Sequence, residues 1–135
     1  MKLIFNFHQS ALIPYQKSGN SIKVLLITTR KNKYWTIPKG FVDPNLSPFE
    51  SARKEAFEEA GISQCKGEKL ISQITLHKKI GLCYLEIFAS QVVTMVDIYP
   101  ESSYRERDWF KLDDAVGLIK NREIADKVKL LPQYI

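Results

Sequence analysis

The sequence predicts an α/β fold in which helices cover a mixed β-sheet. Three observations support this prediction. Four apolar, β-rich runs are bounded by turn formers or charges, one strongly capped helix lies between the second and third runs, and two helical patterns follow them. Because an element that is apolar on one side must bury that side, this order of elements favours helices packed on the faces of a sheet.

The strand candidates combine branched or aromatic residues with polar or turn-forming ends. Gly19-Asn20 lies between the first two and is typical of a single tight turn rather than of a linker. The four candidates are residues 11–15, 24–29, 70–76 and 83–93.

The clearest helix signal begins at Ser47. Ser47 can cap the helix, Pro48 suits its first position, and Glu50 completes a capping box. Gly61 then supplies the stop. At roughly 100° per residue, five apolar residues fall on one stripe, and these are Phe49, Ala52, Ala56, Phe57 and Ala60.

Two further helices are expected near the end of the sequence. Asp113 can cap a short helix that runs through Ile119, and residues 122–131 have apolar positions three and four apart. The strands therefore surround one long helix and precede two shorter ones.

Length and composition indicate a folded protein rather than a disordered one. We expect one domain over residues 1–135, because this length matches a typical domain and 44% of the residues are hydrophobic. The opening residues 1–8 are too polar for a signal-peptide core, and no apolar run is long enough to span a membrane. These features predict a cytoplasmic protein without membrane association.

The two cysteines favour reduced thiols over a zinc site. Cys65 and Cys83 are far apart and lack the spacing of metal ligands, so we expect both to be buried and unpaired.

The net charge of +5 is unevenly distributed. Residues 1–42 contain seven basic residues and no acidic one, whereas all fifteen carboxylates come later. Such a segment attracts polyanions, which include nucleotides, inositol phosphates and RNA, although a solvated basic surface is the simpler alternative. The basic residues are Lys2, Lys17, Lys23, Arg30, Lys31, Lys33 and Lys39.

Three glutamates on the long helix, Glu55, Glu58 and Glu59, require an explanation. Glu55 and Glu59 are a like-charged i,i+4 pair, which costs about 0.2–0.5 kcal/mol in an isolated helix. A solvated acidic face is the ordinary alternative. However, Lys39 and Gly40 lie in a tight charged loop that leads to this helix, which favours a Mg²⁺ site with oxygen ligands.

Gly40 and residues 54–62 resemble the Nudix box. In that motif a Gly is followed, at fixed spacing, by a Glu and then by Arg-Glu, an apolar residue, any residue, Glu-Glu, any residue, Gly and an apolar residue. The resemblance implies a Nudix-like α/β/α sandwich with a mixed sheet, and Mg²⁺-dependent hydrolysis of phosphoanhydride bonds of the nucleoside diphosphate-X type. Residues 10–15, 24–30, 35–40 and 107–110 are similar to the branch that acts on diphosphoinositol polyphosphates and diadenosine polyphosphates.

Two positions depart from the motif. Leu46 replaces its first Glu, and Lys54 replaces its Arg, which removes the planar group that holds a carboxylate bidentately. These departures motivate an alternative, a catalytically weak Nudix-fold module that binds a phosphorylated ligand for regulation. A basic RNA-binding module is a third hypothesis, which has no recognition motif to support it.

The resemblance also implies roles for individual residues. Glu55, Glu58 and Glu59 would bind Mg²⁺, or Mn²⁺ in its place, and carry the catalysis, with a backbone carbonyl at Lys39 or Gly40 as a further ligand. Glu55 is the first candidate for the general base.

Other candidates come from the loops. Glu101 and Glu106 lie in a later loop-like stretch and are alternative bases, although loop acids are usually solvated. Arg30 and Lys39 are candidates for binding substrate phosphate through charge-assisted hydrogen bonds. The predicted partner is a phosphate-rich small molecule; nucleic acid is less favoured, and the oligomeric state is not predicted.

Two aromatic segments and the histidines receive structural interpretations. We expect Trp35 to pack beneath the box helix rather than stack on a base, and Trp109-Phe110 to join the core. No catalytic role is assigned to His8 or His77.

Overall fold

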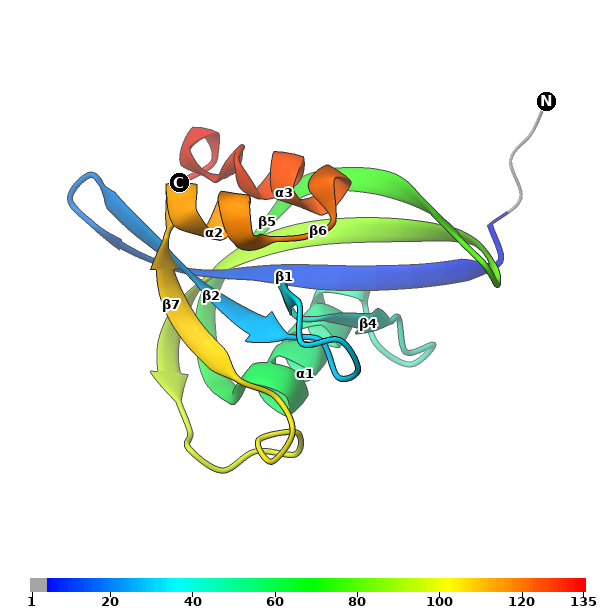
Figure 1. Cartoon of the computed structure of the whole chain (residues 1–135), viewed down its shortest axis with the longest axis horizontal. Helices are drawn as coiled ribbons and strands as arrows, with labels where there is room; N and C mark the ends of the chain where they lie inside the picture. Colours follow the sequence, from blue (N-terminus) through cyan, green and yellow to red (C-terminus); the bar gives the residue numbers. More distant parts are fainter. Residues whose placement is uncertain (1–4) are drawn as a thin grey trace.

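The computed structural model describes residues 5–135, so the first four residues of the polar opening stretch, including Lys2, lie outside it. Seven strands and four helical segments follow one another along the chain (Figure 1). The strands are β1 (Phe7–Ser18), β2 (Ser21–Thr28), β3 (Trp35–Thr36), β4 (Lys39–Phe41), β5 (Ile62–Lys78), β6 (Gly81–Met95) and β7 (Arg107–Lys111). The helices are α1 (Pro48–Ala60), α2 (Leu112–Leu118), α3 (Arg122–Val128) and the 3-10 helix η1 (Leu131–Gln133).

The strands form one mixed sheet, as predicted. Strand β1 pairs in parallel with β6 and antiparallel with β2 and β4. Strand β2 also pairs antiparallel with β3 and β7, and β5 pairs antiparallel with β6. Strand β1 therefore lies at the centre of the sheet.

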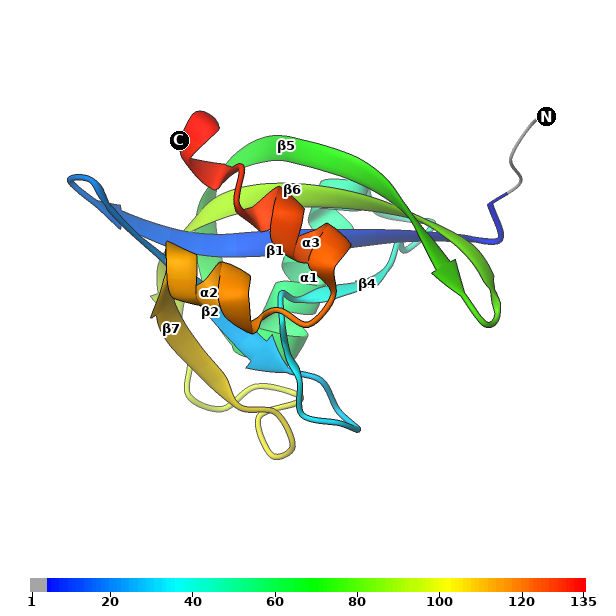
Figure 2. The ribbon, with the colours of Figure 1, turned by 45° about the horizontal axis from the view of Figure 1, so that its top comes forward.

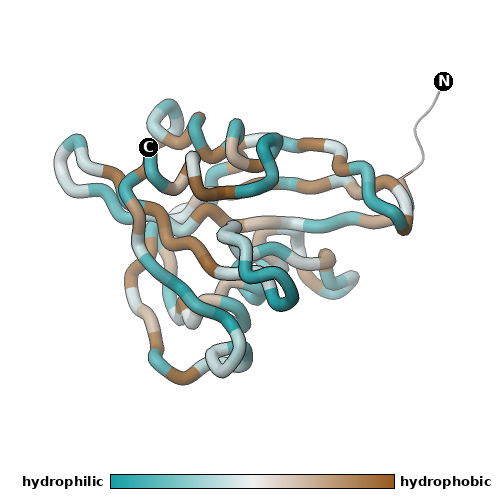
Figure 3. Tube along the Cα trace, viewed as in Figure 1, coloured by the Kyte–Doolittle hydropathy of each residue, from teal (hydrophilic) through white to brown (hydrophobic). Residues whose placement is uncertain are grey.

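Helices cover both faces of this sheet. Helix α1 lies on one face, and α2 and α3 lie on the other (Figures 1 and 2). Alternation along β1 explains this arrangement, because Ala11 and Ile13 pack toward α2 and α3 whereas Leu12 packs toward α1. The tip of the β1–β2 hairpin extends beyond the helices and is hydrophilic (Figure 3).

Local sequence signals explain the bounds of α1. The Ser47 hydroxyl accepts a hydrogen bond from the Glu50 N–H, and the Glu50 carboxylate accepts one from the Ser47 N–H, both at 3.1 Å. Gly61 ends the helix in the left-handed conformation with φ 70°. The prediction that Phe57 belongs to the buried stripe is wrong, since its side chain is 39% exposed on the outer flank of α1.

Several other bounds differ from the prediction. Strands β5 and β6 begin earlier and end later than expected, because polar residues extend them as a paired ribbon whose backbone bonds require no apolar alternation. Asp113 does not cap α2, which begins at Leu112 directly after β7. Helix α3 stops at Val128, and Pro132 follows within a separate 3-10 turn.

The sequence analysis did not resolve β3 and β4, and it noted residues 107–110 without a strand. These strands are short, so they give little periodicity to detect. Over residues 5–135, no helix has both the length and the apolar character to cross a membrane.

Candidate active site

The site is built around two glutamates on the inner side of α1. Glu59 is buried, with 5% of its surface exposed, and its carboxyl is hydrogen-bonded to that of Glu55. The Lys39 N–H, in β4, donates to Glu59 Oε1 at 3.3 Å. Helix α1 and strand β4 are thereby joined at the carboxylates.

Gly40 lets Glu55 approach β4. A methyl group at Gly40 would overlap the Glu55 carboxyl and lie 2.7 Å from its Cγ. Strand β4 is fixed against β1, where Ser10 is the partner of Gly40. The Ser10 hydroxyl is fully buried and, among the residues that the structure describes, lacks a hydrogen-bond partner. A glycine is needed here because only its missing side chain leaves space for the carboxylate.

The loop between β6 and β7 closes over the end of α1. Its Glu101 N–H donates to the Glu58 carbonyl at 3.0 Å. Arg105 Nε donates to Glu101 Oε1 at 2.6 Å, and its Nη2 lies 3.9 Å from Glu59 Oε2. Its Nη1 also donates to the Thr28 carbonyl at 2.8 Å. This buried guanidinium links the loop, α1 and the end of β2.

The carboxylates carry more negative charge than their surroundings balance. Burial raises the pKa of Glu59 to about 9; the hydrogen bond that protonated Glu59 donates to the Glu55 carboxylate acts in the same direction, and the charge of Arg105 opposes it. Burial also raises the pKa of Glu55, and the charges of Glu58 and Glu101 add to this effect, whereas the hydrogen bond with Glu59 opposes it. Such a cluster fits a hard cation.

The carboxylates are not arranged as a complete metal-binding site. No group of three His, Cys, Asp or Glu side chains within residues 5–135 could hold an ion as placed. Instead, Glu55 and Glu59 are hydrogen-bonded to each other. The donor chemistry, oxygens alone with a partnerless buried hydroxyl behind Gly40, nevertheless suits Mg²⁺. The metal-ligand roles stay predictions.

The structure brings some predicted residues together and leaves others apart. Lys39, Gly40 and Glu101 join the three helix glutamates. Arg30 is exposed on the loop after β2, with its guanidinium 4.8 Å from the centre of the Tyr104 ring. Glu106 is also exposed, and its backbone pairs with Thr28 while its carboxylate makes no contact with the cluster.

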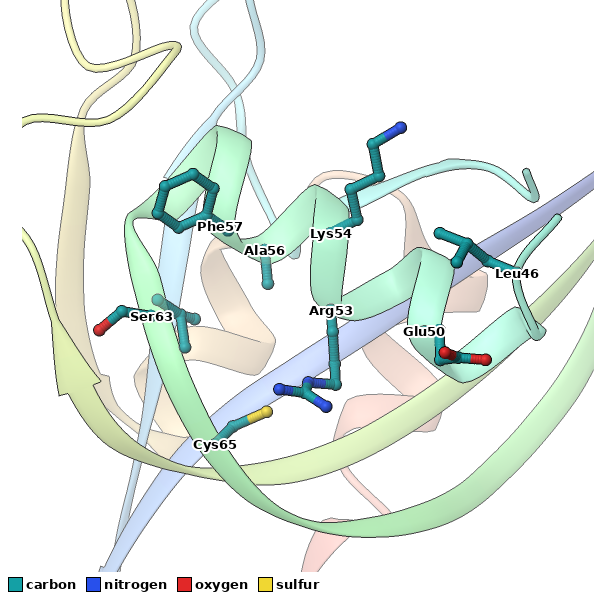
Figure 4. Close-up of a pocket in the computed structure, with 9 residues that line it drawn as sticks. Leu46, Glu50, Arg53, Lys54, Ala56, Phe57, Ser63 and Cys65 are labelled. Atoms are coloured by element: carbon teal, nitrogen blue, oxygen red, sulfur yellow. The ribbon is translucent and has the colours of Figure 1, made fainter.

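The two departures from the box motif lie on the loop before α1 and on α1 itself, where the charge of Lys54 still lowers the pKa of Glu55. Lys54 Nζ pairs with Asp43 Oδ2 at 3.7 Å, so the loop and helix remain linked without residue 46. Leu46 and Lys54 line a groove of about 300 Å³ between α1 and the start of β5, here called the outer groove, together with Arg53 and Cys65 (Figure 4). None of Glu55, Glu58 and Glu59 lines this groove.

Aromatic and sulfur side chains complete the comparison with the sequence predictions. The prediction that Trp35 packs beneath α1 is wrong, because its ring packs edge-on against that of Phe110 on the opposite face of the sheet. The two ring centroids are 5.0 Å apart. Trp109 packs against the α1 side. Cys83 is buried as predicted, whereas Cys65 is only partly buried.

Arg105 is a residue of the site that the sequence does not predict. Its only sequence signal is the i,i+4 spacing to Glu101, and this spacing indicates nothing outside a helix. The contact between Arg105 and Glu59 joins two residues that are far apart in the sequence, so no local pattern indicates it.

Replacing Arg105 by glutamine should lower the free energy of unfolding by about 2 kcal/mol, because it removes the charged hydrogen bond to the partly buried Glu101 and the link to the Thr28 carbonyl. Urea denaturation measures the change. Arg53→Gln is the matched control, since Arg53 is exposed and lies on the outer side of α1. Equal stabilities of the two variants would contradict the prediction.

Comparisons with known proteins agree with this geometry. Residues 7–134 match the family model for the NUDIX domain. Nudix hydrolase 21, chloroplastic, from Arabidopsis thaliana is 32% identical over 114 residues, which are 81% of this chain and 58% of that protein. The chain thus spans less than two thirds of the length of this relative.

One more relative and one solved structure are also similar to this chain. Diphosphoinositol polyphosphate phosphohydrolase 3-alpha from Mus musculus is 27% identical over 126 residues, covering 84% of this chain and 73% of that protein. The solved structure of a C. elegans Ap4A hydrolase binary complex superimposes with a TM-score of 0.78 at 21% identity, over 94% of this chain and 96% of that one. The predicted α/β fold with a mixed sheet is confirmed.

Proposed function

The chain belongs to the Nudix family, and from this premise we propose that it is a Mg²⁺-dependent hydrolase that cleaves a phosphoanhydride bond in a small phosphate-rich molecule. The observation that carries the proposal is the contact of Glu55 and Glu59 with the strand that holds Lys39 and Gly40. The carboxylates of an ordinary acidic helix face would be solvated, whereas the Glu55 carboxyl fills the space that a side chain at Gly40 would take. The family membership supports the prediction of an enzyme.

The residues of the site have distinct roles in this reaction. Glu55, Glu58 and Glu59 would hold Mg²⁺, with the Gly40 carbonyl as a further ligand. When bound, Mg²⁺ neutralises phosphate charge and orients the attacking water. Glu55, whose carboxyl lies against Gly40, would accept the proton of that water.

The two acidic residues of the loop between β6 and β7 have roles that differ from those of the helix glutamates. Glu101 is tied to Arg105 at 2.6 Å, so it is less free to take a proton than Glu55 and we assign it a structural role. Glu106 is exposed and receives no catalytic role. Arg30, stacked on Tyr104 outside the carboxylate cluster, remains a candidate for binding substrate phosphate through its exposed guanidinium.

Two substrate classes are favoured, diadenosine polyphosphates and diphosphoinositol polyphosphates. The mouse relative and the C. elegans structure carry the names of enzymes for these classes. The basic segment before the helix supports either class, because both are polyanions.

The alternative is a Nudix-fold module that binds a phosphorylated ligand for regulation without cleaving it. Leu46 and Lys54 motivate it, but both lie at the outer groove, and Asp43 replaces the lost partner of residue 54. We therefore favour the hydrolase.

The test is release of phosphate or pyrophosphate in the presence of Mg²⁺ from diadenosine polyphosphates, diphosphoinositol polyphosphates, nucleoside triphosphates and triphosphorylated RNA. We expect turnover of at least one of the first two classes and none without a divalent ion. Glu59→Gln provides the inactive control. Binding of these compounds without any turnover would favour the regulatory module instead.

Three expectations from the sequence stay predictions. These are the organisation of residues 1–135 as one domain, the cytoplasmic location and the preference for a small molecule over nucleic acid as the partner. The Arabidopsis relative is named as chloroplastic, so location differs within the family.

A further inference from the structure

Ser10 carries a polar group that the fold leaves without a partner. It lies in the central strand β1 and is fully buried. Among residues 5–135, its hydroxyl is the only buried side-chain oxygen or nitrogen without a hydrogen bond. A buried hydroxyl in this state destabilises the fold, so its presence requires a functional explanation.

The Ser10 side chain points to the face of the sheet that carries α1. Along β1, Ala11 packs toward α2 and α3 whereas Leu12 packs toward α1, and alternation places Ser10 on the same face as Leu12. The antiparallel partner of Ser10 is Gly40, and side chains directly opposite in such a pair share a face. The Glu55 carboxyl takes the place of a side chain at Gly40. Ser10 and Glu55 are therefore neighbours on one face.

The spacing of β1 and β4 brings the Ser10 hydroxyl within reach of this carboxyl. The Leu12 N–H donates to the Pro38 carbonyl at 3.0 Å, so Ser10 and Gly40, two positions along, form the next hydrogen-bonded pair. The Cβ positions of opposite residues are about 5 Å apart. A hydrogen bond of about 2.6 Å between a hydroxyl and a carboxylate bridges such a gap.

Of the two carboxylates beside Ser10, one is already engaged on the sheet. Glu86 in β6 is the parallel partner of Ser10, and its Oε1 accepts from His8 Nε2 at 2.7 Å. The other is Glu55. As placed, no three carboxylates within residues 5–135 could hold an ion, so the glutamates of α1 must turn when an ion binds. Glu55 is the glutamate of this set that lies against Gly40.

We propose that Ser10 is a positioning residue of the metal site, and that its hydroxyl donates a hydrogen bond to the Glu55 carboxylate when this carboxylate binds Mg²⁺. The inference rests on the proposed function, since it takes Glu55 as a ligand of the ion. A carboxylate that binds a cation is held in orientation by a second hydrogen bond, and loss of such support weakens metal binding about ten- to a hundredfold.

The first experiment measures ion binding without turnover. Mn²⁺, as a substitute for Mg²⁺, is titrated calorimetrically into the metal-free full chain, and Ser10→Ala should weaken its binding about tenfold or more. Without metal, the same variant should melt at or above the temperature of the wild type, because it lacks the unpaired buried hydroxyl. A lower melting temperature with unchanged ion binding would show a purely structural role and overturn the inference.

Ser90→Ala is the matched control. Ser90 is also buried, but its hydroxyl donates to the Gly67 carbonyl at 2.7 Å. This variant should therefore melt at a lower temperature than the wild type and bind Mn²⁺ with the same affinity. Equal Mn²⁺ affinities of Ser10→Ala and Ser90→Ala would contradict the proposed role of Ser10.

A double variant identifies the group on which Ser10 acts. Residues that act through one shared hydrogen bond do not have additive effects. In a Glu55→Gln background, Ser10→Ala should therefore cause no further loss of Mn²⁺ affinity. Fully additive losses would show that the hydroxyl serves another group, such as Glu86, and would overturn the inference.

Kinetics separate this inference from the proposed function. On a hydrolysed substrate, Ser10→Ala should raise the Mg²⁺ concentration that gives half-maximal rate about tenfold. Mn²⁺ binding that depends on Ser10 in a protein that hydrolyses no compound would overturn the function and leave the role of Ser10 at the metal site. Mg²⁺-dependent turnover with an ion affinity that does not depend on Ser10 would do the reverse.

Discussion

Replacing Gly40 by alanine should lower kcat about a hundredfold, because a shift of about 1 Å in a reacting group has an effect of that size. The added methyl group would overlap the Glu55 carboxyl, so either the glutamate or β4 must move. Steady-state kinetics on the best substrate of the panel measure the loss, and circular dichroism checks that the protein remains folded.

Gly117→Ala is the matched control for this substitution. Gly117 lies in α2, where an added methyl group would meet nothing within 4 Å. Alanine is favoured over glycine in a helix by about 1 kcal/mol, so this variant should be at least as stable as the wild type and fully active. Normal turnover by Gly40→Ala would show that the position of Glu55 is not critical.

Replacing Glu59 by glutamine should have the larger kinetic effect, a loss of roughly a thousandfold in kcat, as expected when a group that stabilises charge in the transition state is removed. The same change should leave the melting temperature at or above that of the wild type. Glu59 is buried beside Glu55 and its pKa is raised to about 9, so without metal it is neutral near pH 7, and a neutral amide of similar shape buries no new charge in its place.

Both halves of this prediction can be checked on one sample. Kinetics measure the loss of activity, and differential scanning calorimetry without metal measures the melting temperature. Glu68→Gln is the control, because Glu68 is exposed in β5. A variant that loses activity because it is unfolded would contradict the assignment, and so would a stable variant that retains turnover.

The helix that carries the site could be predicted almost to the residue. Its start and stop depend on neighbours within a few positions, namely Ser47 with Glu50, and Gly61. The central strands were found for a similar reason, since alternation is a local property. Polar strand segments such as residues 62–69 were missed, because backbone pairing alone holds them.

Features that depend on distant contacts could not be predicted. Arg105 meets Glu59, and Lys78 meets Gln9, across long stretches of sequence. The same limit explains the error on Trp35, whose contact with Phe110 depends on the pairing of β2 with both β3 and β7. Sequence spacing identified the chemistry of α1 but not the residues that surround it.

Strand β4 lies next to the site, and its pairing with β1 cannot shift by one residue without changing the site. Strand β4 has three residues, and Ser10 faces Gly40 while Ala11 faces Lys39. A slip of one position would exchange the two faces of the strand, placing a lysine side chain where Glu55 now lies and the glycine on the face that packs toward α2 and α3. Inserting or deleting a single residue between Pro38 and Phe41 is therefore a more severe change to this protein than most substitutions of its hydrophobic residues.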